Sequence, residues 1–146
     1  MIRHWLDMPP VWLAGFAALA WLLAPSEPPG ASMLWVGRGV IALGLGLALW
    51  AALAFRRART TIVPKSRPAA LVESGPFRFS RNPIYLADLV ILAGWSLSLG
   101  APWTLGLLVP FWWVLEHRFI RGEEAVLTAD LGEPYRAYCT RVRRWL

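Results

Sequence analysis

The chain has 146 residues, of which 57% are hydrophobic and ten are tryptophan, and it carries a formal charge of +6. This length has room for one domain, and so apolar a composition is unusual for a soluble one. The single cysteine, Cys139, excludes an intramolecular disulfide and a cysteine-rich metal site, and the two histidines, His4 and His117, do not make a zinc site.

Four apolar runs, taken in chain order, predict a bundle of membrane-spanning helices. They cover residues 9–24, 33–55, 84–99 and 101–115. A helix needs about 20 residues to cross about 30 Å of hydrocarbon, so the second run is ample and the others need polar flanks. The first run also has the short apolar centre of a secretory signal, but we expect it to be retained. We therefore predict an all-α integral membrane bundle of about four transmembrane helices.

Basic residues predict the orientation of this bundle. They lie between the second and third runs and after the fourth, whereas residues 25–32 and 99–102 carry none. By the positive-inside rule, both termini and the long middle loop are cytoplasmic. The basic residues between the second and third runs are Arg56, Arg57, Arg59, Lys65, Arg67, Arg78 and Arg81. Those after the fourth run are Arg118, Arg121, Arg136, Arg141, Arg143 and Arg144.

The positive charge is accounted for by this topology and by anionic lipid headgroups. We expect no nucleic-acid partner, because no DNA- or RNA-binding motif accompanies the charge. The preference for arginine over lysine, with much alanine, leucine and glycine, suggests a bacterial GC-rich genome and hence a bacterial inner membrane.

Small residues in the second run predict close helix packing, because they recur at spacings of three and four and let backbones approach in lipid. They are Gly37, Gly39, Ala42, Gly44, Gly46, Ala48, Ala51 and Ala52.

The later elements are predicted from proline and glycine. Pro83 suits the first turn of the third span, Pro110 predicts a kink in the fourth, and that helix is expected to project past residue 115 into the cytoplasm. Gly132 should end it and Pro134 should start a last helix. Within the third span, Asp88 needs either a structural partner, Arg81 or Arg78, or a place in a site.

Four polar residues follow the fourth run at helical spacing. On an ideal helix Glu116 and Glu123 share a face, as do His117 and Glu124. Carboxylates so placed bind an ammonium group or ribose hydroxyls, or are simply solvated beside Arg121, and the spacing leaves both interpretations open.

The stretch "ESGPFRFSRNPIY", residues 73–85, is too polar for a simple connection in so apolar a chain. Gly75 and Pro76 predict a tight turn, Arg81 offers a planar fork for a carboxylate, and the N–H groups of residues 82–85 form an anion site at a helix start. The alternative is an interfacial loop anchored by the aromatic residues Phe77, Phe79 and Tyr85.

Two segments resemble a known family. "LVESGPFRFSRNPIYLADL" and, about forty residues later, "RGEEAVLTADLGEPYRAYCTRVRRW" are similar to the isoprenylcysteine carboxyl methyltransferase family, with its relatives among membrane phospholipid methyltransferases. The family pattern is Gly-Pro-aromatic-Arg, Arg-His-Pro-x-Tyr, Glu-Glu-x-x-Leu, Leu-Gly or aromatic-Gly, Tyr-x-x-Tyr and Val-x-Arg. The resemblance covers residue 71 to the C-terminus, about half of the chain.

The resemblance implies an integral membrane, all-helical methyltransferase that holds S-adenosylmethionine at its cytoplasmic side. Residues 1–55 would supply two packing helices and residues 56–146 the methyltransferase part of one domain, with Gly132 shaping a lid. Glu116 and Arg121 are the catalytic candidates. The cofactor-binding candidates are Gly75, Arg81, Asn82, Pro83, Tyr85, Glu123, Glu124, Tyr135 and Tyr138, and no metal is expected.

Asn82 stands where the family usually has histidine, and the ending "VRRWL" predicts a short lid. Asparagine hydrogen-bonds but does not titrate, so this position supplies no base. We therefore favour a lipid-like or small apolar acceptor that arrives anionic or softly nucleophilic and enters from the bilayer.

The alternatives are a phospholipid ethanolamine N-methyltransferase, a sterol-type reductase using a nicotinamide cofactor, and a non-catalytic membrane scaffold. The methyltransferase hypothesis requires Tyr85 and Glu123 to lie close enough to touch one small molecule.

Overall fold

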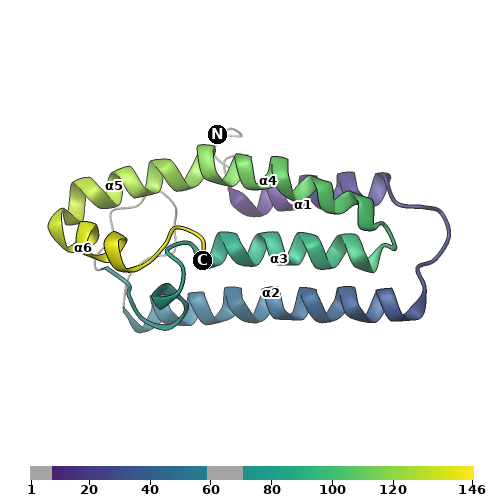
Figure 1. Cartoon of the computed structure of the whole chain (residues 1–146), viewed down its shortest axis with the longest axis horizontal. Helices are drawn as coiled ribbons and strands as arrows, with labels where there is room; N and C mark the ends of the chain where they lie inside the picture. The colour runs from purple at the N-terminus through teal and green to yellow at the C-terminus, as the bar shows by residue number, and fades with distance from the viewer. Residues whose placement is uncertain (1–7, 59–70) are drawn as a thin grey trace.

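The computed structural model describes residues 8–58 and 71–146, which form helices and short connections without a strand (Figure 1). The all-α prediction is confirmed for this part of the chain. His4, Arg59, Lys65 and Arg67, which entered the predictions, lie outside the described residues.

The helices follow one another in a simple order. They are α1 (Pro9–Leu22), α2 (Ala31–Arg57), the 3-10 turn η2 (Gly75–Arg78), α3 (Pro83–Ser98), the 3-10 segment η3 (Pro102–Leu107), α4 (Leu108–Val114), the π-helical turn η4 (Leu115–Ile120), α5 (Arg121–Leu131) and α6 (Glu133–Arg141). The segments α4, η4 and α5 run on without a break as one long helix, which extends past residue 115 as predicted (Figure 1).

Proline and glycine set several of these boundaries. Pro83 and Pro134 lie in the first turns of α3 and α6, where the missing N–H removes no helical hydrogen bond. Gly132 separates α5 from α6 with a φ of +59°, a conformation that favours glycine. These three predictions are confirmed.

The winding of the fourth apolar run is irregular in two places. It is 3-10 helical from Pro102 to Leu107 and becomes α-helical just before Pro110, which has no N–H to donate to the residue four positions earlier. The second irregularity is the π turn η4, which the sequence did not predict.

The most extensive helix–helix contact among the described residues joins α2 and α3. Gly37, Gly44 and Ala51 are buried, and a methyl group added at Gly37 would lie 2.4 Å from the backbone nitrogen of Ser98. The predicted close packing therefore occurs along one face of α2.

One helix in the described part of the chain, α2, is both long and apolar enough to cross a membrane. Its 27 residues span about 40 Å at the rise of an α-helix. The apolar helices α1 and α3 are shorter, with 14 and 16 residues. Large apolar side chains lie exposed on the outside of the bundle, as expected of a surface that contacts lipid; they include Trp35, Leu43, Leu49, Val109 and Trp113.

The main buried core joins α3, α4 and η4 and consists of Tyr85, Leu92, Phe111, Leu115, Phe119 and Ile120, with Trp12 and Phe16 of α1 packed against it. At one end of the bundle, where α2 ends and α3 begins, lie η2, α5, α6 and the C-terminal segment (Figure 1). We call this the site end, because the predicted site residues lie on these elements.

Candidate functional site

The two motifs meet at the site end. The hydroxyl of Tyr85, in the first turn of α3, donates a hydrogen bond of 2.6 Å to Oε1 of Glu123, in the first turn of α5. The Tyr85 ring is 6% exposed and stacks on Phe119 of the π turn. The requirement that these two residues lie within reach of one small molecule is therefore met.

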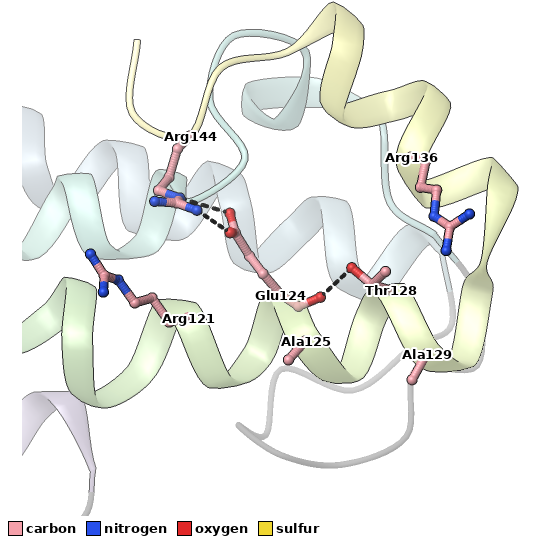
Figure 2. Close-up of a pocket in the computed structure, with 7 residues that line it drawn as sticks. All are labelled: Arg121, Glu124, Ala125, Thr128, Ala129, Arg136 and Arg144. Atoms are coloured by element: carbon pink, nitrogen blue, oxygen red, sulfur yellow. Dashed lines mark hydrogen bonds and ion pairs between the residues drawn. The ribbon is translucent and has the colours of Figure 1, made fainter.

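Arg144 lies three residues beyond the end of α6 at Arg141. It joins two carboxylates that the helical spacing placed on different faces. Its Nε and Nη2 atoms donate to the two oxygens of Glu124 at 3.1 and 2.6 Å, as Figure 2 shows, and its Nη1 atom donates to Oε1 of Glu116 at 2.5 Å. A two-pronged guanidinium–carboxylate contact of this kind fixes geometry as well as charge. The hydrogen bonds to Glu124 also raise the pKa of Arg144.

The remaining contacts of Glu116 come from two further donors. Trp145 Nε1 donates to its Oε2 at 3.1 Å, and Arg121 Nε lies 3.6 Å from its Oε1. Glu116 is 4% exposed, whereas the Arg121 side chain is 57% exposed. The structure thus brings the two catalytic candidates together, with Arg121 on the solvent side.

The π turn explains why the carboxylates pair as they do. A π turn inserts an extra residue into the helical winding, so side chains beyond it are rotated relative to those before it. The pairing of Glu116 with Glu123 expected from an ideal helix is replaced by Glu116 with Glu124, which bind one guanidinium, while Glu123 turns to Tyr85.

His117 does not join Glu124, its expected partner on an ideal helix. Its ring is exposed and stacks on Trp113 at 4.5 Å, and its Nδ1 atom lies 2.9 Å from the carbonyl oxygen of Trp113. The π turn that re-pairs the glutamates accounts for this difference as well.

Arg81 reaches the carboxylates from the loop before α3. Its Nη1 atom lies 3.4 Å from Oε1 of Glu124 and donates to the Cys139 sulfur at 2.7 Å. Arg81 therefore pairs with Glu124 and not with Asp88, which was one of the alternatives. Its Nε–H group is buried and has no hydrogen-bond partner within the described residues. A buried donor of this kind is costly unless an acceptor reaches it.

The C-terminal residues 143–145, which we call the strap, cross the loop before α3. The Arg81 N–H donates to the carbonyl of Arg143 at 3.0 Å, and Ser80 Oγ and Asn82 Nδ2 donate to the carbonyl of Arg144 at 3.3 and 3.1 Å. The Asn82 N–H donates to Ser80 Oγ. Two of the N–H groups near the predicted anion site are thus bound within the protein, and Asn82, buried against the strap, holds it in place.

Tyr135 and Tyr138 lie on α6 and are buried together with Val142. The Tyr138 hydroxyl donates to the Phe77 carbonyl at 2.7 Å, which fastens α6 to η2. Burial raises the pKa of both tyrosines above the ordinary value, so both hydroxyls stay protonated donors at neutral pH.

Gly75 and Pro83 have roles that follow from their backbone positions. Gly75 starts η2 with a φ of +62° and packs against Trp50 and Ala54 of α2, which confirms the predicted tight turn. Pro83 is buried in the first turn of α3 and directly follows Asn82 in the chain. Both shape the loop that carries Arg81.

An open pocket of about 740 Å³ lies on α5 beside this network (Figure 2). Of the predicted site residues, Arg121 and Glu124 line it. The full lining is Arg121, Glu124, Ala125, Thr128, Ala129, Arg136 and Arg144. The salt-bridged carboxylate of Glu124 therefore connects the buried network to a space large enough for a small molecule.

Sequence reasoning gave no site role to Arg144 or Trp145, and it did not predict the contacts that Ser80 makes with the strap and Cys139 with Arg81. The signal for Arg144 was present, because it is the arginine of the Val-x-Arg element in the family pattern, yet it was counted only among the cytoplasmic positive charges. The other three are identified by their contacts alone.

Comparisons with known proteins agree with these motifs. A sequence profile described as "Phospholipid methyltransferase" matches residues 32–133, more than half of the chain. The chain is 34% identical over 86 residues to the Delta(14)-sterol reductase of Mus musculus, an alignment that covers 55% of this chain but 19% of the reductase. It is 42% identical over 65 residues to an uncharacterized protein of Haemophilus influenzae, covering 43% of this chain and all of that protein. The profile match over residues 32–133 establishes that the chain belongs to the phospholipid methyltransferase family.

Proposed function

We propose that this protein is a membrane methyltransferase that uses S-adenosylmethionine to methylate a lipid-like or small apolar acceptor. The observation that carries the proposal is the 2.6 Å contact between Tyr85 and Glu123, which joins the two motifs of the family at one end of the bundle. Membership of the phospholipid methyltransferase family supports the reaction class.

The donor set suits the proposed cofactor. S-adenosylmethionine presents a carboxylate, an ammonium group, a sulfonium and ribose hydroxyls, and it supplies an electrophilic methyl group. The buried Nε–H of Arg81 lacks an acceptor among the described residues, and a carboxylate would satisfy it. The carboxylates of Glu123 and Glu124 are suitable partners for ammonium or hydroxyl groups. The open pocket beside Glu124 provides space for the rest of the molecule.

Methyl transfer from a sulfonium is an in-line displacement, so alignment and exclusion of water supply most of what the protein must contribute. An acceptor amine would first have to lose a proton to a base. Glu116 already accepts hydrogen bonds from Arg144 and Trp145, and Glu123 already accepts a hydrogen bond from the Tyr85 hydroxyl. These contacts favour an acceptor that arrives as a carboxylate or thiolate. The family description keeps phospholipid ethanolamine N-methylation as the main alternative.

We further propose the four-span topology, with α1, α2, α3 and the helix that starts at α4 crossing the membrane and the site end facing the cytoplasm. Single cysteines introduced at residues 26 and 136 of a Cys139→Ser protein should be labelled by an impermeant maleimide from opposite sides of the membrane. Labelling of both from one side would contradict the topology.

The function is tested by binding and by turnover. Calorimetry in detergent should detect binding of S-adenosylmethionine and of its demethylated product, and incubation with membrane extract and methyl-labelled cofactor should label a lipid or a small apolar molecule. Vesicles that contain phosphatidylethanolamine distinguish the alternative acceptor. Absence of binding of either cofactor form would favour the membrane scaffold instead.

Glu123→Gln should weaken binding of the demethylated cofactor by about tenfold, because a neutral amide replaces a charge-assisted hydrogen-bond acceptor. Calorimetry compares the variant with Arg38→Gln, which lies near the opposite end of α2 and should bind normally. An unchanged affinity of the Glu123 variant would remove this residue from the site.

The similarity to the sterol reductase supports a second candidate, a reductase that uses a nicotinamide cofactor. That candidate requires the phosphates of the dinucleotide to contact arginines, so the phosphorylated dinucleotide should bind more tightly than the unphosphorylated one. A competition experiment on the purified protein measures which binds more tightly, this dinucleotide or demethylated S-adenosylmethionine. The result decides between the reductase and the methyltransferase.

A further inference from the structure

The strap is fastened at the site end by two separate sets of contacts. The first set joins its backbone carbonyls to Ser80, Arg81 and Asn82. The second set consists of the side chains of Arg144 and Trp145, which bind Glu116 and Glu124. Because the sets use different atoms, substitutions can weaken either one alone.

The second set determines where two carboxylates point, of which Glu116 is buried and Glu124 is half-buried. Glu116 is 4% exposed and the Glu124 side chain 14% exposed, so each charge needs a partner at short range. Arg144 contributes one guanidinium to both, and Trp145 takes the second oxygen of Glu116. A carboxylate oxygen accepts more than one hydrogen bond, so both groups keep acceptor capacity for a ligand.

We propose that Arg144 is a positioning residue of the site, and that it acts by holding Glu116 and Glu124 in one fixed arrangement. Of these two carboxylates, Glu124 lines the open pocket on α5. This inference rests on the proposed function and extends it, because it makes the C-terminal strap part of the cofactor site. Arginine suits this role because its planar fork contacts two acceptors at set angles, whereas the ammonium of lysine is a single point charge.

The test uses four variants of the full-length protein. Arg144→Gln removes the guanidinium and Arg144→Lys keeps the charge without the fork. Arg143→Gln removes a neighbouring positive charge and leaves the bonded carbonyl of residue 143 in place. The Arg143 side chain is exposed and makes no hydrogen bond or ion pair with the described residues. Ser80→Ala weakens the backbone fastening of the strap and leaves the carboxylates untouched.

Three measurements are made on each variant: calorimetric affinity for the demethylated cofactor, the split between kcat and the KM for S-adenosylmethionine, and hydrogen exchange of the strap without cofactor. Arg144→Gln should lower the affinity by about tenfold and raise KM, with Arg144→Lys intermediate. Ser80→Ala should speed exchange of the strap and keep the affinity within about twofold, and Arg143→Gln should match the unaltered protein.

The outcomes separate the two proposals. If the unaltered protein binds and Arg144→Gln binds equally well, the positioning role is overturned while the proposed function stands. Equal losses of affinity in Ser80→Ala and Arg144→Gln, with equal gains in strap exchange, would assign Arg144 a purely structural role and also overturn it. Full affinity in Arg144→Lys would overturn the requirement for the fork. Failure of the unaltered protein to bind overturns the proposed function and this inference together.

Discussion

Gly94→Ala is expected to destabilise the protein by about 3 kcal/mol, although alanine is the better helix former. A methyl group at Gly94 would lie 2.6 Å from the backbone nitrogen of Ile41 and 2.7 Å from the carbonyl oxygen of Gly37. Both neighbours are backbone atoms of α2, so no side chain can rotate away. The two helices must separate, and the close contact that holds helices together in lipid is lost along their length.

Gly39→Ala is the matched control, because it makes the same chemical change in α2, where the added methyl group meets nothing within 4 Å. It should be neutral or stabilise the protein by up to about 1 kcal/mol through helix propensity. Thermal unfolding of both variants in one detergent measures the difference. Similar midpoints for the two variants would mean that α2 and α3 do not pack as described.

This pair of glycines also marks a limit of the sequence. Gly37 and Gly44 form one stripe along α2, and Gly39 and Gly46 form another with the same spacing of seven. Both stripes satisfy the pattern for close packing, yet α3 packs on the first, while the second has open space. The choice depends on contacts that α3 makes with the rest of the protein, and spacing within one helix does not contain that information.

Helix ends and motif proximity could be predicted, because they depend on local chemistry or on the family pattern. Gly132 ends α5 through its positive φ, and Pro134 starts α6 through its fixed φ. The meeting of Tyr85 with Glu123 was expected from the resemblance alone, since nothing in either segment indicates the other.

The arrangement of carboxylates could not be predicted, because it depends on the π turn. Residues 115–120 contain no proline or glycine that would mark an irregular winding, so an ideal helix was assumed. One inserted residue then changes which glutamate faces Arg144. The partner itself lies 20 residues beyond Glu124 along the chain, and the path of the strap brings it back only through contacts with Ser80 and Asn82.

Glu124→Gln is expected to lower the free energy of unfolding by about 2 to 3 kcal/mol and to abolish detectable binding of the demethylated cofactor at concentrations that saturate the unaltered protein. The amide keeps the size of the side chain but turns an NH₂ group toward the guanidinium of Arg144 or Arg81. Both groups are hydrogen-bond donors, so no hydrogen bond forms between them. Arg144 then keeps only its contact with Glu116, and Arg81 loses its ion pair with Glu124. This expected loss is smaller than for a fully buried pair, because the Arg144 side chain is 36% exposed and water screens part of the effect.

Glu133→Gln provides the control on the neighbouring helix. Glu133 also faces an arginine, Arg136, at 3.8 Å, but their side chains are 82% and 67% exposed. An exposed pair of this kind contributes little, so the thermal midpoint and the cofactor affinity should stay at the values of the unaltered protein. If both glutamine variants behave alike, the carboxylate of Glu124 is solvated instead of bound by Arg144, and the site end is not organised around the strap. If only Glu124→Gln loses stability and binding, the carboxylate of Glu124 links the fold of the C-terminal segment to the cofactor site.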